Sequence, residues 1–326
     1  MSILILAETL DPCADLMVRA LVERAVVVHR MDTSWFPWQV SLDARLCDGR
    51  WGGTLRSPHG VTRLEDIKSV WYRSPAAFVL PVELSAGEQQ HIRIEGKFGL
   101  GGVLLSLPVR WVNRPDLSAT ACYKPVQLVA AVRAGLTVAD TLITNTGRAV
   151  HNFVAHHARD GGGQVVTKML ASNSITETTG RSVAFTRSVG LNDLADLTGI
   201  ESTTHLFQQR VPKAFDCRVV SIGKNLFGFA IFADSEVSKL DFRRDYQALR
   251  YDQIEVPAEV AAGITALVTE LGLLYAAIDF VVDTDGRWVF IGDVNPGGQY
   301  GWLEAATGAP LTDTLADLLT HGEGNR

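Results

Sequence analysis

The feature that most constrains the fold of this chain is the segment 277–296, which reads as two strands joined by a tight turn. Both strands are apolar and rich in β-branched residues, as is typical of strands buried in a sheet. The Thr-Asp-Gly loop between them places Gly286 at a position that requires a positive φ. The resulting register predicts that Ala277 lies opposite Asp293.

Acidic and amide side chains recur on one face of this predicted β-ribbon. Because residues two apart on a strand share a face, we expect Asp279, Asp293 and Asn295 to project on the same side. Asp279 lies within an otherwise apolar run, where a buried carboxylate is costly unless it is paired or bound to a metal. Hard oxygen ligands at this spacing suit Mg²⁺ that also holds phosphates. The sequence therefore predicts a Mg²⁺ site at these three residues.

Composition and charge restrict the class of protein. With 326 residues, 47% of them hydrophobic and 20% charged, the chain is expected to be globular, with two or three domains. A net charge of −6 argues against a protein devoted to nucleic acid. No apolar run reaches the ~18 residues of a membrane helix, and the first residues do not resemble a signal peptide. Four scattered cysteines indicate reduced thiols, so we expect a cytoplasmic location.

Periodicity and turn signals divide the chain into three segments, 1–115, 116–204 and 205–326. The strand–helix–strand order at the start predicts an N-terminal α/β domain, and the chain as a whole reads as α/β (α+β). In the second segment, residues 116–135 are expected to form one helix, and the polar residues 170–181 a loop.

Three histidines occur in a helix predicted over 147–158, namely His151, His156 and His157. Their spacing does not match that of a closed zinc site with a fourth ligand. The sequence therefore favours a polar helix face over a metal site.

Several short motifs follow one another along the chain. They are Lys124 in Tyr-Lys-Pro, Lys168 in Val-Val-Thr-Lys-Met-Leu, Phe207-Gln-Gln-Arg-Val-Pro-Lys213, Asp216-Cys-Arg218, Asp241-Phe-Arg243, Ala-Ile-Asp279-Phe and Asp293-Val-Asn295-Pro. Together they resemble the ATP-grasp ligases. A closer resemblance, to the ATP-grasp maturases of ribosomal peptides (the graspetide synthetases of the microviridin and plesiocin type), includes further motifs. These are Trp71-Tyr-Arg-Ser-Pro, Trp111-Val-Asn-Arg-Pro, Val211-Pro-Lys-Ala-Phe and Gly298-Gln-Tyr-Gly-Trp302.

This resemblance implies an ATP-grasp fold: an N-terminal α/β pre-ATP-grasp domain, a central lid domain that contacts a leader peptide, and a C-terminal ATP-grasp domain. It implies ATP and Mg²⁺ as cofactors, with ATP between the last two domains. The residues that it assigns to the nucleotide are Lys124, Lys168, Gln208, Gln209, Arg210, Val211, Lys213 and Asp216, with the two lysines at the phosphates and Gln208 through Val211 along the adenine. It assigns Arg218 and Arg243 to the substrate carboxylate, and Asp279, Asp293 and Asn295 to the metal.

The activity implied is a ligase that phosphorylates Asp or Glu side chains of a ribosomal precursor peptide (leader plus core) and closes esters with Ser or Thr, or amides with Lys. The relatives indicate a homodimer, without a membrane or nucleic-acid partner. Two alternatives stay open. One is an ATP-dependent carboxylate–amine ligase that acts on small molecules or peptide termini, and the other is a non-catalytic ATP- and peptide-binding module.

The chain departs from the family pattern at two places. Phe290-Ile-Gly-Asp293 replaces the usual Phe-Leu-Glu, so the acid is one methylene shorter and a glycine precedes it. Either the metal geometry is looser, or Gly292 bulges to compensate. Gln208-Gln209 replaces the usual Gln-Glu, which keeps a hydrogen-bond acceptor but removes its charge.

Overall fold

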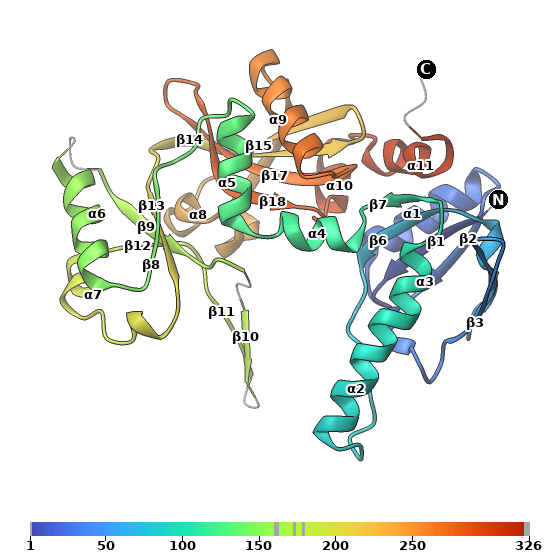
Figure 1. Cartoon of the computed structure of the whole chain (residues 1–326). Helices are drawn as coiled ribbons and strands as arrows, with labels where there is room; N and C mark the ends of the chain where they lie inside the picture. The colour runs from blue at the N-terminus through green and yellow to red at the C-terminus, as the bar shows by residue number, and fades with distance from the viewer. Residues whose placement is uncertain (1, 160–162, 172–173, 178–179, 323–326) are drawn as a thin grey trace.

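The computed structural model describes residues 2–159, 163–171, 174–177 and 180–322 (Figure 1). Three groups of strands follow one another along the chain, each covered by helices. Among the described helices, none combines the length and apolar character that a membrane span requires.

The N-terminal part contains a parallel sheet of order β2-β1-β6-β7 beside an antiparallel sheet of order β3-β4-β5. Strand β1 is buried on both faces, because Ile3 and Ile5 join one core and Leu4 and Leu6 another. This double burial explains its uninterrupted apolar sequence. The elements are β1 (Ser2–Ala7), α1 (Pro12–Glu23), β2 (Val27–Met31), η1 (Thr33–Trp35), β3 (Ser41–Cys47), β4 (Arg50–Ser57), β5 (Gly60–Arg63), η2 (Leu64–Asp66), β6 (Ile67–Ser74), α2 (Ala86–Gly96), the π-helical turn η3 (Lys97–Gly101), α3 (Gly102–Leu105) and β7 (Arg110–Val112).

The central part is a sheet of order β12-β9-β13-β8, with helix α6 packed on one face through Val150. The predicted loop at 170–181 is wrong for residues 174–177 and 180–181, which lie in the arms of a β-hairpin that projects from this sheet (Figure 1). The elements are β8 (Thr141–Thr144), α6 (Gly147–Arg159), β9 (Val165–Lys168), β10 (Ser174–Glu177), β11 (Gly180–Val183), β12 (Arg187–Ser188), α7 (Leu191–Ala195), η4 (Ile200–Ser202) and β13 (His205–Gln209).

The C-terminal part is an antiparallel sheet of order β16-β15-β14-β17-β18. Helices α5 and α9 cover one face, and α10 and α11 cover one end of the other face. The uncovered end of that second face carries Asp216, Arg218 and Asp279. The elements are β14 (Lys213–Ile222), β15 (Asn225–Ala233), α8 (Glu236–Leu240), η5 (Phe242–Arg244), η6 (Tyr246–Ala248), β16 (Leu249–Ile254), α9 (Ala258–Glu270), β17 (Tyr275–Asp283), β18 (Trp288–Asn295), α10 (Gly301–Thr307) and α11 (Leu311–His321).

The single helix predicted over 116–135 is wrong, because two helices, α4 (Pro115–Ala121) and α5 (Lys124–Arg133), occupy this segment. Pro125 lies in the first turn of α5, where its missing N–H is tolerated and where it prevents one helix from running through. The break places Lys124 at the start of α5, where it is only 7% exposed.

The register between β17 and β18 changes at a bulge around Gly292. Next to the turn, Phe280 pairs with Phe290, as the predicted three-residue loop requires. Past the bulge, Ala277 pairs with Asn295, so the predicted pairing of Ala277 with Asp293 is wrong. Gly292 adopts a φ of 74°, which allows β18 to insert extra residues opposite Asp279.

The bulge keeps the metal-face prediction intact. Because it adds an even number of residues, Phe290 and Val294 both still face the core beneath α5 and α9. Asp293 and Asn295 then alternate to the opposite face of β18, on the same side as Asp279. The common face of the three side chains thus survives a register that the sequence did not predict.

The bulge makes Gly292→Ala more damaging than an equivalent change in the turn. A residue with a Cβ at this positive φ loses roughly 1 kcal/mol, and the new Cβ would lie 3.0 Å from Leu128 Cδ2. We expect a loss of about 2 kcal/mol in the free energy of unfolding, measured by urea denaturation. The matched control is Gly286→Ala, where φ is 81° and no atom lies within 4 Å of the new Cβ, with an expected loss of about 1 kcal/mol. Equal losses in the two variants would contradict a crowded bulge.

Candidate functional site

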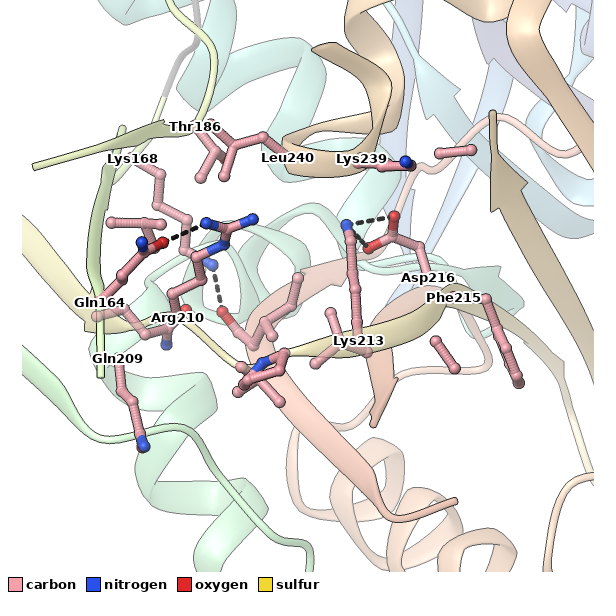
Figure 2. A pocket seen from close by; sticks show the side chains of 18 of the residues that line it. Gln164, Lys168, Thr186, Gln209, Arg210, Lys213, Phe215, Asp216, Lys239 and Leu240 are labelled. Carbon is pink, nitrogen blue, oxygen red and sulfur yellow. Dashed lines mark hydrogen bonds and ion pairs between the residues drawn. The ribbon is translucent and has the colours of Figure 1, made fainter. Parts of the chain in front are cut away.

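A cavity of about 670 Å³ lies between the central sheet and the uncovered end of the C-terminal sheet (Figure 2). This volume is within the range of small-molecule sites. All the residues predicted to bind nucleotide line it, except Lys124. The polar and charged residues of its wall are Gln164, Lys168, Thr186, Gln208, Gln209, Arg210, Lys213, Asp216, Lys239, Arg243 and Asp293.

Two lysines bind the carbonyl groups at the β18 bulge. Lys168, at the end of β9, donates from Nζ to the carbonyl of Ile291. Lys124 donates to the carbonyl of Gly292 (3.1 Å) and to Asp293 Oδ1 (2.9 Å). The bulge interrupts the hydrogen-bond ladder between β17 and β18 at this point. The two ammonium groups therefore donate hydrogen bonds to backbone carbonyls of the bulge. Both predicted phosphate-binding lysines therefore meet at the same short stretch of β18.

The charges of this stretch are strongly interdependent. Burial alone would raise the pKa of Asp293, but Lys124 and Lys168 hold that pKa below its ordinary value, with a smaller effect from Arg243. Burial also lowers the pKa of Lys168 to about 8, against a smaller upward effect from Asp293. Asp293 is thus ionised at neutral pH, and Lys168 is still mostly protonated there but loses its proton at a lower pH than an ordinary lysine.

Arg218 and Asp279 form a bidentate ion pair across neighbouring strands. The Nε–Oδ1 and Nη2–Oδ2 distances are 2.7 and 2.8 Å. Burial alone would lower the pKa of Arg218, but Asp279 raises it above its ordinary value. The guanidinium carbon also lies 5.8 Å from the ring centroid of Phe242 and 5.6 Å from that of Trp302. Arg218 is therefore held in one orientation on β14, and it is not among the residues that line the cavity.

Arg243 differs from Arg218 in that it lines the cavity directly. Its Nε and Nη2 donate to the carboxylate of Asp241 at 2.8 and 2.9 Å. Although burial alone would raise it, hydrogen bonding and charge from Arg243 lower the pKa of Asp241 to about 2. Asp241 also accepts a hydrogen bond from the backbone N of Thr186 (3.0 Å), which joins this wall to the central part.

The three predicted metal ligands share one face, and their chemistry fits Mg²⁺. Two carboxylates and one carboxamide offer hard oxygen donors. Asp293 uses only Oδ1 for Lys124, and a carboxylate that accepts a bidentate arginine keeps further lone pairs, so Asp279 retains acceptor capacity. Asn295 Oδ1 accepts from the backbone N of Gly297 at 3.2 Å, which orients its oxygen.

The strand predicted to contact adenine, β13, lies at the cavity wall with much of its polar backbone engaged. The backbone N of Gln209 donates to the carbonyl of Asp140 (2.9 Å). Gln208 is 3% exposed, and its Nε2 donates to Thr141 Oγ1 (2.8 Å). The side chain of Gln208 therefore supports β8, and Gln209 is the more exposed of the two at the cavity.

Lys213 and Asp216 form an ion pair at the far end of the cavity (Figure 2). Lys213 Nζ donates to Asp216 Oδ1 at 2.7 Å. Burial nevertheless raises the pKa of Asp216 to about 6, because the desolvation of its carboxylate outweighs the attraction of Lys213.

A buried glutamine that sequence reasoning missed supports β18 beyond the bulge. Gln127 Nε2 donates to the carbonyl of Val294 (2.9 Å), and Gln127 Oε1 accepts from the N of Val294 (3.0 Å). The side chain thus takes the place of a neighbouring strand between Asp293 and Asn295. A glutamine within a helix gives no sequence signal for such a role.

A buried asparagine joins the ends of β17 and β18. Asn113 Nδ2 donates to the carbonyls of Tyr275 (2.7 Å) and Pro296 (2.9 Å), and Oδ1 accepts from the N of Tyr275 (3.1 Å). Arg73 adds a hydrogen bond to the carbonyl of Gly297. Both residues belong to motifs that carried the family resemblance, Trp-Val-Asn-Arg-Pro and Trp-Tyr-Arg-Ser-Pro, but the sequence assigned no role to either side chain.

Comparison with known proteins places this geometry in context. Residues 2–117 match the family model of the MvdD pre-ATP-grasp domain. No curated protein matches the sequence. The solved macrocyclase MdnC from Microcystis aeruginosa MRC, bound with its precursor peptide MdnA, is 26% identical with a TM-score of 0.86, over 98% of this chain and 99% of that one.

Two further structures agree over the whole length. A RiPP-associated ATP-grasp ligase from Chryseobacterium gregarium, in complex with ADP and a leader and core peptide, is 26% identical with a TM-score of 0.89, over 99% and 98% of the two chains. PsnB, complexed with a variant of its minimal precursor, Mg and ADP, is 20% identical with a TM-score of 0.76 over 99% of each chain, which shows a common fold.

The predicted ATP-grasp fold is confirmed, together with the predicted pre-ATP-grasp domain. The chain therefore has an ATP-grasp fold with an MvdD-type pre-ATP-grasp domain over residues 2–117, and it is similar over its full length to RiPP-associated ATP-grasp ligases and macrocyclases.

Proposed function

We propose that this chain is an ATP- and Mg²⁺-dependent macrocyclase of a ribosomally made precursor peptide. The observation that carries the proposal is the convergence of Lys168, Arg243 and Asp293 on one cavity, beside the carboxylate of Asp279. The full-length similarity to MdnC and to the Chryseobacterium gregarium ligase supports a nucleotide and a peptide as its partners.

The proposed reaction activates a carboxylate, which by itself is a poor acylating agent because oxide is a poor leaving group. Transfer of the γ-phosphoryl group of ATP to an Asp or Glu side chain gives an acyl phosphate and ADP. A Ser or Thr hydroxyl, or a Lys amine, of the same peptide attacks the acyl carbon, forms an ester or amide, and expels phosphate as its own proton leaves. Phosphoryl transfer depends on positioning and charge neutralisation, for which a cationic cavity is suited.

The roles proposed for individual residues follow from their positions. When ATP binds, Lys124 and Lys168 donate hydrogen bonds to phosphate oxygens in place of the backbone carbonyls, because phosphate oxygens are stronger acceptors. Arg243, on the cavity wall, binds the substrate carboxylate through its planar fork. Arg218, held by its ion pair with Asp279, contributes positive charge from strand β14. Mg²⁺, when bound, would neutralise phosphate charge beside the metal face.

Several assignments stay predictions. The backbone between Gln208 and Val211 would contact adenine, and Lys213 and Asp216 would close the far end of the nucleotide site. The central part would contact the leader peptide. The homodimer and the cytoplasmic location are proposed on the same basis, as is the division of the chain after residues 115 and 204, although β13, which directly follows the second boundary, is a strand of the central sheet.

The direct test uses the purified protein, Mg²⁺, ATP and a candidate precursor, which would be a short Asp/Glu- and Thr-rich peptide with leader and core sought among the neighbouring genes. We expect mass spectrometry to show that the peptide loses the mass of one water for each bond formed. One ADP should be released for each water lost. Asp293→Asn should reduce the turnover by about a hundredfold or more, because it removes a charged ligand from the metal face. Asp285→Asn, in the exposed turn of the same ribbon, is the matched control and should retain wild-type turnover.

The other outcomes separate the alternatives. ADP release with a small acid and amine, but without peptide, would indicate a carboxylate–amine ligase of small molecules. Tight nucleotide binding with no ADP formed on any substrate would indicate a binding module. Wild-type turnover in Asp293→Asn would contradict the metal assignment.

The lowered pKa of Lys168 predicts a pH-dependent nucleotide affinity. Above its pKa of about 8, Lys168 is neutral in the free protein, so binding a phosphate requires the uptake of a proton. We expect the Kd of a non-hydrolysable ATP analogue with Mg²⁺ to rise about tenfold from pH 8.5 to 9.5, and to change little from pH 6.5 to 7.5. Isothermal titration calorimetry measures both ranges.

Lys168→Arg is the matched variant for this prediction, because arginine keeps its proton throughout the range. Its Kd should stay flat up to pH 9.5. The same rise in both proteins would assign the titration to another group and contradict a phosphate contact at Lys168.

A further inference from the structure

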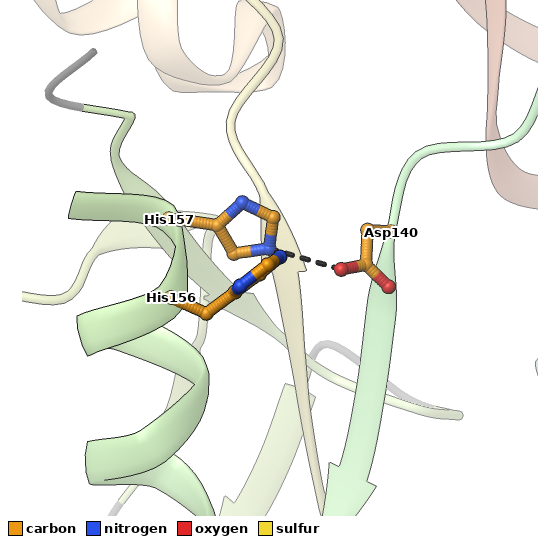
Figure 3. A group of neighbouring side chains, drawn as sticks. All are labelled: Asp140, His156 and His157. Carbon is orange, nitrogen blue, oxygen red and sulfur yellow. Dashed lines mark hydrogen bonds and ion pairs between the residues drawn. The ribbon is translucent and has the colours of Figure 1, made fainter. Parts of the chain in front are cut away.

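A second group of metal-binding side chains lies outside the nucleotide cavity, at the junction of α6 and β8 (Figure 3). Asp140 directly precedes β8, and His156 and His157 belong to the last turn of α6. One ligand atom from each residue lies within 4.8 Å of the others. The three side chains converge although Asp140 precedes His156 by 16 positions in the sequence.

The group combines one fixed ligand with two accessible ones. His157 is 5% exposed, and its ring packs edge-on against Phe153 with the centroids 4.7 Å apart. Its Nε2 lies 3.1 Å from Asp140 Oδ2. His156 is exposed, and the side chain of Asp140 is 53% exposed. An ion could therefore reach the group from solvent while the buried imidazole stays in place.

The sequence favoured a polar helix face for His151, His156 and His157, and this expectation is wrong for His157. Adjacent histidines lack the spacing of a zinc motif, so the sequence showed no ligand set. The missing carboxylate comes from Asp140, which only the packing of α6 against the central sheet brings into reach. His151 is not a member of the group.

We propose that Asp140, His156 and His157 form a binding site for Zn²⁺ or a similar divalent transition-metal ion. Two imidazoles and one carboxylate are a common set of three protein ligands for zinc, with water as the fourth ligand. Zn–ligand bonds of about 2.1 Å place tetrahedral ligand atoms about 3.4 Å apart, so the exposed His156 and Asp140 need only small side-chain rotations. The C-terminal end of α6, a helix of 13 residues, adds a negative dipole potential that favours a cation.

The simpler reading is that the His157–Asp140 hydrogen bond only anchors α6 to the sheet. The two readings differ at His156, which the anchor does not need and the metal site does. They also differ in the effect of zinc on stability, because an ion that bridges α6 and β8 stabilises only the folded protein.

The test titrates Zn²⁺ into untagged, chelator-treated full-length protein, with a chromophoric chelator as competitor. We expect one Zn²⁺ per chain and a rise in melting temperature on zinc addition. Co²⁺ in place of Zn²⁺ should give visible absorption bands typical of a four-coordinate site. Asp140→Asn and His156→Gln should each weaken zinc binding by about tenfold or more and abolish the rise in melting temperature. Neither substitution removes a buried side chain.

His151→Gln is the matched control, since His151 is exposed on the same helix and should leave zinc affinity unchanged. Zinc held on the exposed thiols of Cys47 and Cys122 would be insensitive to Asp140→Asn and His156→Gln, and that result would overturn the proposal. The absence of stoichiometric binding would overturn it as well. Because no nucleotide or peptide is present, the result is independent of the proposed macrocyclase activity.

Discussion

The candidate site depends on one interaction, the binding of two lysine ammonium groups to the backbone of a bulged strand. Gly292 lets β18 bulge, and Lys168 and Lys124 bind the carbonyls of Ile291 and Gly292. The lysines reach this point from two different elements, the end of β9 and the start of α5. A local irregularity of one strand thereby sets the position of the cationic groups and, through Lys124, of the Asp293 carboxylate.

The surrounding charges are arranged as pairs. Arg218 with Asp279, Lys124 with Asp293 and Arg243 with Asp241 each pair a cation with a carboxylate, and two of these residues, Asp293 and Arg243, line the cavity itself. Such buried pairs contribute little net stability, because desolvation offsets most of their attraction. We attribute a functional role to their arrangement instead. When the nucleotide and the metal ion bind, the phosphates would become partners of the cationic side chains and the metal ion a partner of the carboxylates. No buried charge would then be left without a partner of opposite sign.

The sequence predicted the chemistry of the site better than its geometry. The α/β organisation, the turn at Gly286 and the common face of Asp279, Asp293 and Asn295 followed from apolar periodicity and turn chemistry, whereas the ATP-grasp fold came from the family resemblance. The bulge at Gly292 was one of two possibilities, and the pairing of Ala277 could not be predicted because it depends on a positive φ within a strand. Gln127, Asn113 and Asp140 were missed for a common reason: each acts through a contact with residues distant in the chain, and no local pattern marks it.

The central claim is that the bulged end of the ribbon holds a divalent cation against the phosphates of ATP. A crystal structure of the protein with Mg²⁺ and a non-hydrolysable ATP analogue tests it most directly. The account predicts an ion coordinated by oxygens of Asp279, Asp293 and Asn295, with Lys168 moved from the Ile291 carbonyl to a phosphate. A nucleotide bound outside the cavity, or an ion with none of these three ligands, would contradict it.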